Sequence, residues 1–206
     1  MRRHQLLSTT TTILLSLLPI AHSTPITCLT NSTCTTIESL VACFNDYTVP
    51  ANFYDQSSYD AAQPNATEST AWTDAITSLL WVDNNCSTTA VPSILNGVFT
   101  ISLFNESVPN GGSYCVLSEV DAGPSGYTRG WGLAIVPASR AAVSRFVHFS
   151  TPEPVSLENT PLQSVTLFAS IGAKSLLISG RDRRSYNVTT PCVAATPGTE
   201  PFYVTR

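Results

Sequence analysis

The sequence predicts an α/β fold: a single disulfide-stapled domain with a mixed sheet and a C-terminal βαβ unit. Three observations predict this class. An apolar strand, a capped helix and a second apolar strand follow one another over residues 145–179. A hairpin pattern precedes them over residues 98–118. The chain also holds six cysteines, an even number that favours disulfide bonds.

The first predicted element is a secretory signal peptide over residues 1–23. Two arginines open the chain after Met1, residues 13–20 (ILLSLLPI) form a short apolar run, and a small-x-small cleavage site ends at Ser23. The apolar run is too short to span a bilayer, and no later run is longer. We therefore expect residues 24–206 to form one secreted, extracellular domain with no membrane anchor.

Removal of the signal peptide changes the charge and the histidine content. Two arginines leave with it, so the formal net charge shifts from −4 to −6, and one histidine remains, His148. This excludes a metal site with two or more histidine ligands from this chain, and a Ser-His-Asp triad would have to use His148. The acidic balance argues against a nucleic-acid partner.

The predicted elements of the first half are two helices and a loop. Residues 36–45 form a helix capped by Thr35, with Glu38 completing a capping box. Residues 47–66 carry two prolines and many small polar residues, which indicates a long loop. The second helix covers residues 71–81.

The second helix has Thr70 as its expected cap, and its apolar residues recur at helical spacing. Trp72 and Trp81 lie on this helix, and we expect both in the core. A hairpin follows, with strands over 98–104 and 114–118 joined through an Asn-Gly-Gly turn.

The second half continues with a loop over residues 121–126 and strands over 131–136 and 145–149. A helix over 158–172 has Thr160 as its expected cap, Pro161 in its first turn and Gly172 as its stop. A strand over 175–179 (SLLIS) comes next. Strand, helix and strand in this order predict two parallel strands joined by a right-handed crossover.

Ligands bind beyond the carboxyl ends of parallel strands, so the candidate site lies in the two loops that leave those ends. Glu153 follows the first parallel strand and Asp182 the second. Two carboxylates in one crevice suit acid–base catalysis or a divalent cation held by oxygen ligands, and an ion-pair network with neighbouring arginines is the structural alternative.

Three further side chains are candidates for substrate binding. Arg181 and Arg183 belong to a basic cluster after the second parallel strand, and such a cluster favours an anionic ligand. His148 lies in the first parallel strand, where a histidine on the sheet face is the competing interpretation. No nucleotide-binding motif, serine-hydrolase elbow or zinc-protease motif is present.

The cysteines and glycosylation motifs agree with export. Six cysteines allow 15 pairings, between which the sequence does not choose, and these cysteines are Cys28, Cys34, Cys43, Cys86, Cys115 and Cys192. Five N-x-S/T motifs predict glycosylated surface positions, and these are Asn31, Asn65, Asn85, Asn105 and Asn187.

The C-terminal part of the chain resembles a group of secreted or surface proteins of bacteria and fungi, most of them uncharacterised. The matching segments are R-G-W-G at residues 129–132, Pro152-Glu153-Pro154, Thr160-Pro161 and residues 174–183 (KSLLISGRDR), followed by a cysteine. The group's pattern has P-H-P and G-x-H-R where this chain has Glu153 and Asp182. The resemblance implies a metal or hydrolytic site, and two changed histidines imply its degeneration. Residues 24–128 add nothing to the resemblance.

Three functions follow as hypotheses. The first is a secreted glycoprotein with a hydrolase-like but degenerate site, which acts by binding an extracellular ligand. The second is an active secreted hydrolase that uses Glu153 and Asp182 with a divalent cation; their oxygen ligands suit a hard cation better than zinc. The third is a small secreted effector that acts on another organism.

Overall fold

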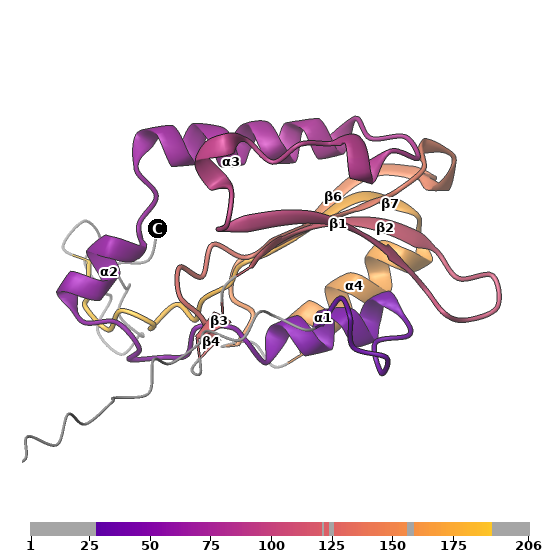
Figure 1. The fold of residues 1–206 in the computed structure, drawn as a ribbon. Coiled ribbons are helices and arrows are strands. Elements are labelled where there is room, and N and C mark those ends of the chain that lie inside the picture. The colour runs from indigo at the N-terminus through magenta and orange to yellow at the C-terminus, as the bar shows by residue number, and fades with distance from the viewer. Residues whose placement is uncertain (1–27, 121, 124–125, 156–158, 191–206) are drawn as a thin grey trace, which may run out of the picture.

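The computed structural model describes residues 28–120, 122–123, 126–155 and 159–190 (Figure 1). The predicted signal peptide and Cys192 lie outside these residues. The fold centres on a five-stranded sheet. In sheet order its strands are β1 (Phe99–Asn105), β2 (Ser113–Glu119), β5 (Leu133–Pro137), β7 (Ala173–Ile178) and β6 (Arg145–Thr151). A separate two-stranded ribbon pairs β3 (Ala122–Gly123) with β4 (Gly126–Tyr127).

The sheet is mixed, as the sequence predicts. β6 and β7 are parallel, and the other neighbouring strands are antiparallel. Helix α4 (Thr160–Ser170) connects β6 to β7, so the C-terminal βαβ unit is confirmed. The β1–β2 hairpin is also confirmed, with Phe99 opposite Glu119 and Asn105 opposite Ser113. The α/β class therefore holds.

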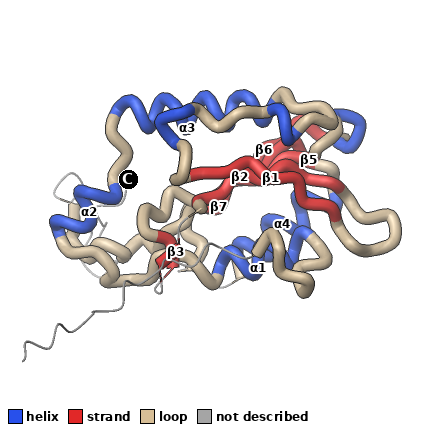
Figure 2. Tube along the Cα trace, in the orientation of Figure 1, coloured by secondary structure: helices blue, strands red, loops and turns tan. Residues whose placement is uncertain are grey.

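Helices cover both faces of the sheet. Helix α3 (Ala66–Leu80) lies over one face, and α1 (Ile37–Asn45) and α4 lie over the other, with the strands between them (Figures 1 and 2). The short α2 (Gln56–Ala62) lies at one end of the fold, beyond the end of α3 (Figure 1). Single 3-10 turns occur at η1 (Cys86–Thr88), η2 (Ser93–Leu95) and η3 (Arg140–Ala142).

Each face of the sheet has its own apolar core, and each core contains a disulfide. Phe44 and Phe168 are buried between the sheet and the α1/α4 layer, where Cys28 pairs with Cys43. The α3 layer packs over Leu117 and Val136. There Cys86 pairs with Cys115 and ties η1 to β2. Both disulfides restrict the unfolded chain and so stabilise the fold.

Three predicted N-caps are wrong, because a different polar residue occupies the N-cap position in each helix. Asn65 caps α3 and Glu68 returns the bond, so the helix starts before Thr70. Thr36 caps α1 with Ser39 as its reciprocal partner, in place of Thr35 and Glu38. Asn159, with a left-handed φ of 61°, precedes α4 and leaves Thr160 inside the helix.

Two other predictions for the first half are wrong. The region predicted as a loop over 47–66 contains α2, because Asp55 and Ser58 form a capping box there. Trp81 is 67% exposed rather than in the core, since it follows the last turn of α3 and lies under the guanidinium of Arg140. Trp72 is half-buried and faces a cavity.

Candidate functional site

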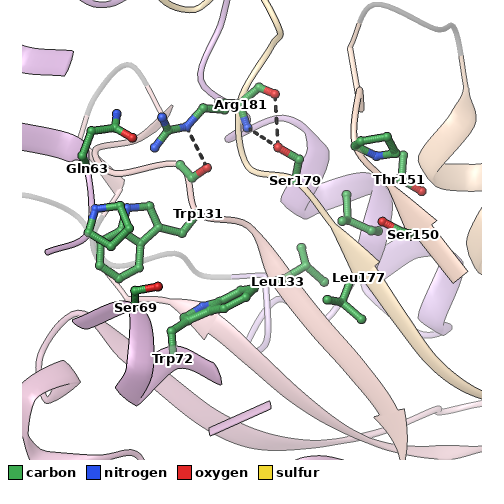
Figure 3. Close-up of a pocket in the computed structure, with 14 residues that line it drawn as sticks. Gln63, Ser69, Trp72, Trp131, Leu133, Ser150, Thr151, Leu177, Ser179 and Arg181 are labelled. Atoms are coloured by element: carbon green, nitrogen blue, oxygen red, sulfur yellow. Dashed lines mark hydrogen bonds between the residues drawn. The ribbon is translucent and has the colours of Figure 1, made fainter. Parts of the chain in front are cut away.

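A cavity of about 420 Å³ opens where β6 and β7 end, as expected for the carboxyl ends of parallel strands (Figure 3). Its wall comes from three parts of the chain: the ends of β6 and β7, the start of α3 with the residues before it, and the segment before β5. In Figure 3, Trp72 and Trp131 lie on one side of the cavity, and Ser150 and Thr151 on the other.

The R-G-W-G segment, residues 129–132, packs directly against the end of β7. Gly132 has a φ of +91°, and a Cβ there would lie 2.0 Å from the carbonyl oxygen of Ile178. A Cβ on Gly180 would lie 2.7 Å from the backbone nitrogen of Gly132. Two parts of the sequence that carry the resemblance are therefore joined by a close backbone approach that only glycine permits.

Glu119, at the end of β2, holds the R-G-W-G segment in place. Its side chain is buried and accepts hydrogen bonds from the backbone N–H of Arg129 (2.8 Å) and of Gly130 (3.0 Å). Burial raises the pKa of Glu119 to about 7, although these amides oppose the shift. Sequence reasoning missed this residue, whose only signal is an acid at the end of an apolar strand (YCVLSE).

Trp131 forms a fixed wall of the cavity. Its Nε1 donates to the carbonyl oxygen of Ala62 at 2.7 Å, and its ring stacks on Phe99 with centroids 5.7 Å apart. The guanidinium of Arg129 lies 5.0 Å from the Trp131 ring centroid and pairs with Glu68 at 2.8 Å. Contacts to α2, α3 and β1 thus fix the orientation of this indole.

Arg181 is the predicted substrate-binding residue that lines the cavity. Its side chain is buried, and its Nε donates to the carbonyl oxygen of Gly130 at 3.2 Å (Figure 3), while Nη2 donates to that of Arg129. The guanidinium carbon lies 5.6 Å from the ring of Tyr54 and 6.0 Å from that of Tyr59. The cation is therefore held rigidly at one end of the cavity.

Glu153 and Asp182, the predicted catalytic and metal-binding pair, are not among the residues that line the cavity. Glu153 lies 4.0 Å from Arg183, and both side chains are about one-third exposed. Asp182 is buried and accepts from the backbone N–H of Arg184 at 2.6 Å. The described residues contain no group of three or more His, Cys, Asp or Glu side chains placed to hold a metal. A cation bound at Glu153 or Asp182 would therefore need ligands other than the His, Cys, Asp and Glu side chains of the described residues.

His148 lies on the sheet rather than at the cavity. Its Nδ1 is 2.7 Å from the hydroxyl oxygen of Ser175, the residue directly opposite on β7. Ser175 is 1% exposed in the middle of its strand, so a substrate carbonyl has no access to its hydroxyl. This geometry suits a cross-strand hydrogen bond better than a nucleophile–base pair.

The cysteines that the structure describes are paired or buried, whereas the sequon asparagines lie at the surface. Four of the six cysteines form the two disulfides. Cys34 is buried and has no disulfide partner among the described residues, and burial raises the pKa of its thiol. All five sequon asparagines are exposed.

None of the helices that the structure describes has the length and apolar character needed to cross a membrane.

Comparison with protein-family models, with curated proteins and with solved structures finds no match. The candidate site therefore stands on the geometry above.

Proposed function

We propose that the protein is a secreted glycoprotein that acts by binding a small ligand in the cavity at the ends of β6 and β7, and that its hydrolase-like positions are degenerate. One observation carries this proposal: within the described residues, the wall of the cavity contains no carboxylate and no histidine. A histidine or a carboxylate is the group that most often activates water in hydrolases. Apolar walls with a few fixed polar groups are typical of binding sites.

The proposal of secretion and glycosylation draws support from two other features. The two disulfides are compatible with an oxidising compartment. The exposure of all five sequon asparagines leaves each side chain open to a glycan. N-terminal sequencing of the exported protein should begin at Thr24, and enzymatic deglycosylation should lower its mass.

Ligand extraction tests the binding function. The protein is secreted from a eukaryotic host, purified without denaturation and extracted with organic solvent for mass spectrometry, beside a Ser150→Trp variant. Ser150 is exposed at the cavity rim, so the added indole should block the cavity without disturbing the core. We expect a compound retained by the wild type and lost from the variant. Equal recovery from both proteins would contradict binding in this cavity.

A Glu153→Gln variant tests the rival hydrolase in the same preparation. The binding proposal expects no difference between this variant and the wild type in assays of ester, glycoside and peptide hydrolysis. A turnover that the wild type shows and Glu153→Gln lacks would overturn the proposal in favour of catalysis.

A further inference from the structure

Arg181 carries a buried positive charge that forms no ion pair among the described residues. Arg181 is 5% exposed. The arginines that form ion pairs within the described residues are Arg129, Arg183 and Arg184. Nε and Nη2 donate to backbone carbonyls, but Nη1 is buried and has no hydrogen-bond partner in the described part of the chain. A guanidinium has five N–H donors, so Arg181 retains capacity for one more acceptor.

Glu119, the acid nearby, forms no ion pair with this guanidinium in the described structure. It belongs to the same buried cluster, since Glu119 and Arg181 both act electrostatically on Tyr54. However, its two carboxylate oxygens already accept the amides of Arg129 and Gly130. Its raised pKa, about 7, also leaves it partly protonated at neutral pH. A buried cation without a counter-ion is costly, and an anion in the cavity would remove that cost.

The walls beside Arg181 suit a flat apolar group. Trp72 and Trp131 supply two indoles and Leu177 an aliphatic surface (Figure 3). The Nε1 of Trp131 is already bonded, whereas the buried Nε1 of Trp72 has no hydrogen-bond partner among the described residues. The cavity thus combines aromatic faces, which favour an aromatic ligand, with two donors that lack acceptors.

We propose that the cavity binds a small aromatic carboxylate, with its carboxylate on Nη1 of Arg181 and its ring against the indoles of Trp72 and Trp131. This inference rests on the proposed function, that the cavity is a binding site. Arg181 is the only charged residue among those that line the cavity in the described structure. A single guanidinium with one unpartnered nitrogen suits a monoanionic carboxylate better than a doubly charged phosphate, which favours several cations.

Calorimetric titration with two probes of the same shape tests the inference. The first probe is 2-naphthoate and the second is its neutral analogue 2-naphthamide. We expect the wild type to bind the acid at least about tenfold more tightly than the amide, because a hydrogen bond to a charged group is among the stronger kinds. Arg181→Met should remove this preference, because it removes the charge and keeps a long side chain.

Two further variants separate the roles of the residues. Trp72→Leu should weaken the binding of both probes alike and leave their ratio unchanged, since it removes an aromatic wall and no charge. Arg140→Met is the matched control, because Arg140 also packs over an indole, that of Trp81, and does not line the cavity. This variant should bind both probes as the wild type does.

The outcomes separate this inference from the proposed function. Equal wild-type affinity for acid and amide, or binding of neither, overturns the aromatic carboxylate, while the extraction experiment with Ser150→Trp decides the binding function independently. A preference for the acid that survives in folded Arg181→Met overturns the role of Arg181. The wild-type comparison of the two probes needs no variant, so the inference stays testable even if Arg181→Met fails to fold.

Discussion

The loops that leave the carboxyl ends of β6 and β7 differ in how the protein holds them. In the β7 loop (residues 179–184), the backbone of Val49 bonds on both sides of Arg181: it donates to the carbonyl of Gly180 and accepts from the N–H of Asp182, each at 2.8 Å. The β6 loop (residues 152–155) projects Glu153, whose side chain is one-third exposed and lies 4.0 Å from Arg183.

Two loops at equivalent positions in the sheet topology therefore offer different chemistry to a ligand. Both loops lie where a parallel sheet places its ligand sites. Only the β7 loop presents a charged group that backbone contacts fix and bury, and preorganised charges are the ones that bind strongly. The exposed pair of Glu153 and Arg183 remains solvated, and such pairs contribute little to stability or recognition.

The largest expected effect comes from Gly132, on which the β7 loop packs. In Gly132→Ala, the new Cβ would meet the carbonyl oxygen of Ile178 at 2.0 Å, at a φ of +91°. We expect a loss of at least about 4 kcal/mol in the free energy of unfolding, because buried backbone cannot move aside. Urea denaturation followed by circular dichroism measures it.

Gly97→Ala is the matched control for this substitution. Gly97 also has a positive φ, +78°, but nothing lies within 4 Å of the position of its Cβ. The control should lose only about 1 kcal/mol, the cost of the backbone conformation alone. Similar losses in the two variants would show that the contact between Gly132 and β7 does not hold the loop.

The second expected effect is a pH dependence that comes from Glu119, which holds the segment that Arg181 contacts. Its pKa is about 7 in the folded protein against an ordinary value of 4.5. Between these values the folded state retains a proton that the unfolded state loses. The free energy of unfolding should therefore fall as the pH rises from about 5 to 7, by up to roughly 3 kcal/mol, and then level off.

Glu119→Gln should remove this slope, because an amide does not titrate. Glu106→Gln is its matched control, since the carboxylate of Glu106 also accepts two backbone amides, those of Ile37 and Gly112. The control should keep the slope. Urea denaturation between pH 5 and pH 8 distinguishes the two variants, and a slope that persists in Glu119→Gln would assign it to another group.

Much of the fold is predictable from local sequence patterns, and the misses have local causes. The βαβ unit carries apolar strands and a helix with a proline in its first turn, and both patterns act within a few residues. The predicted caps are wrong where more than one polar residue could occupy the N-cap position. The helix α2 was missed because its seven residues (QSSYDAA) bury only Tyr59 and Ala62, too few for a helical apolar pattern.

The sequence predicts where the site lies, but it predicts only some of the residues that form it. Topology locates the crevice, and the sequence also selects Arg181. It does not show that Glu153 and Asp182 lie outside the cavity wall, because side-chain direction depends on contacts distant in the sequence. Glu119 was missed for the same reason: its partners, Arg129 and Gly130, are fixed only by the fold.

The smallest expected effects come from the acid of each loop, Asp182 in the β7 loop and Glu153 in the β6 loop. Asp182→Asn should lower the free energy of unfolding by about 1–3 kcal/mol, because its buried carboxylate accepts the backbone N–H of Arg184 and an amide bonds less strongly. Glu153→Gln should change it by less than about 0.5 kcal/mol, since its ion pair with Arg183 is partly exposed. Urea denaturation at neutral pH and at low and high salt measures both.

The salt series sharpens the contrast between the loops. Added salt should leave the difference between Asp182→Asn and the wild type unchanged, because buried charges are screened little. It should abolish any small difference for Glu153→Gln. A loss for Glu153→Gln as large as that for Asp182→Asn would mean that the β6 loop is held as firmly as the β7 loop. Glu153 would then return as a candidate for the site.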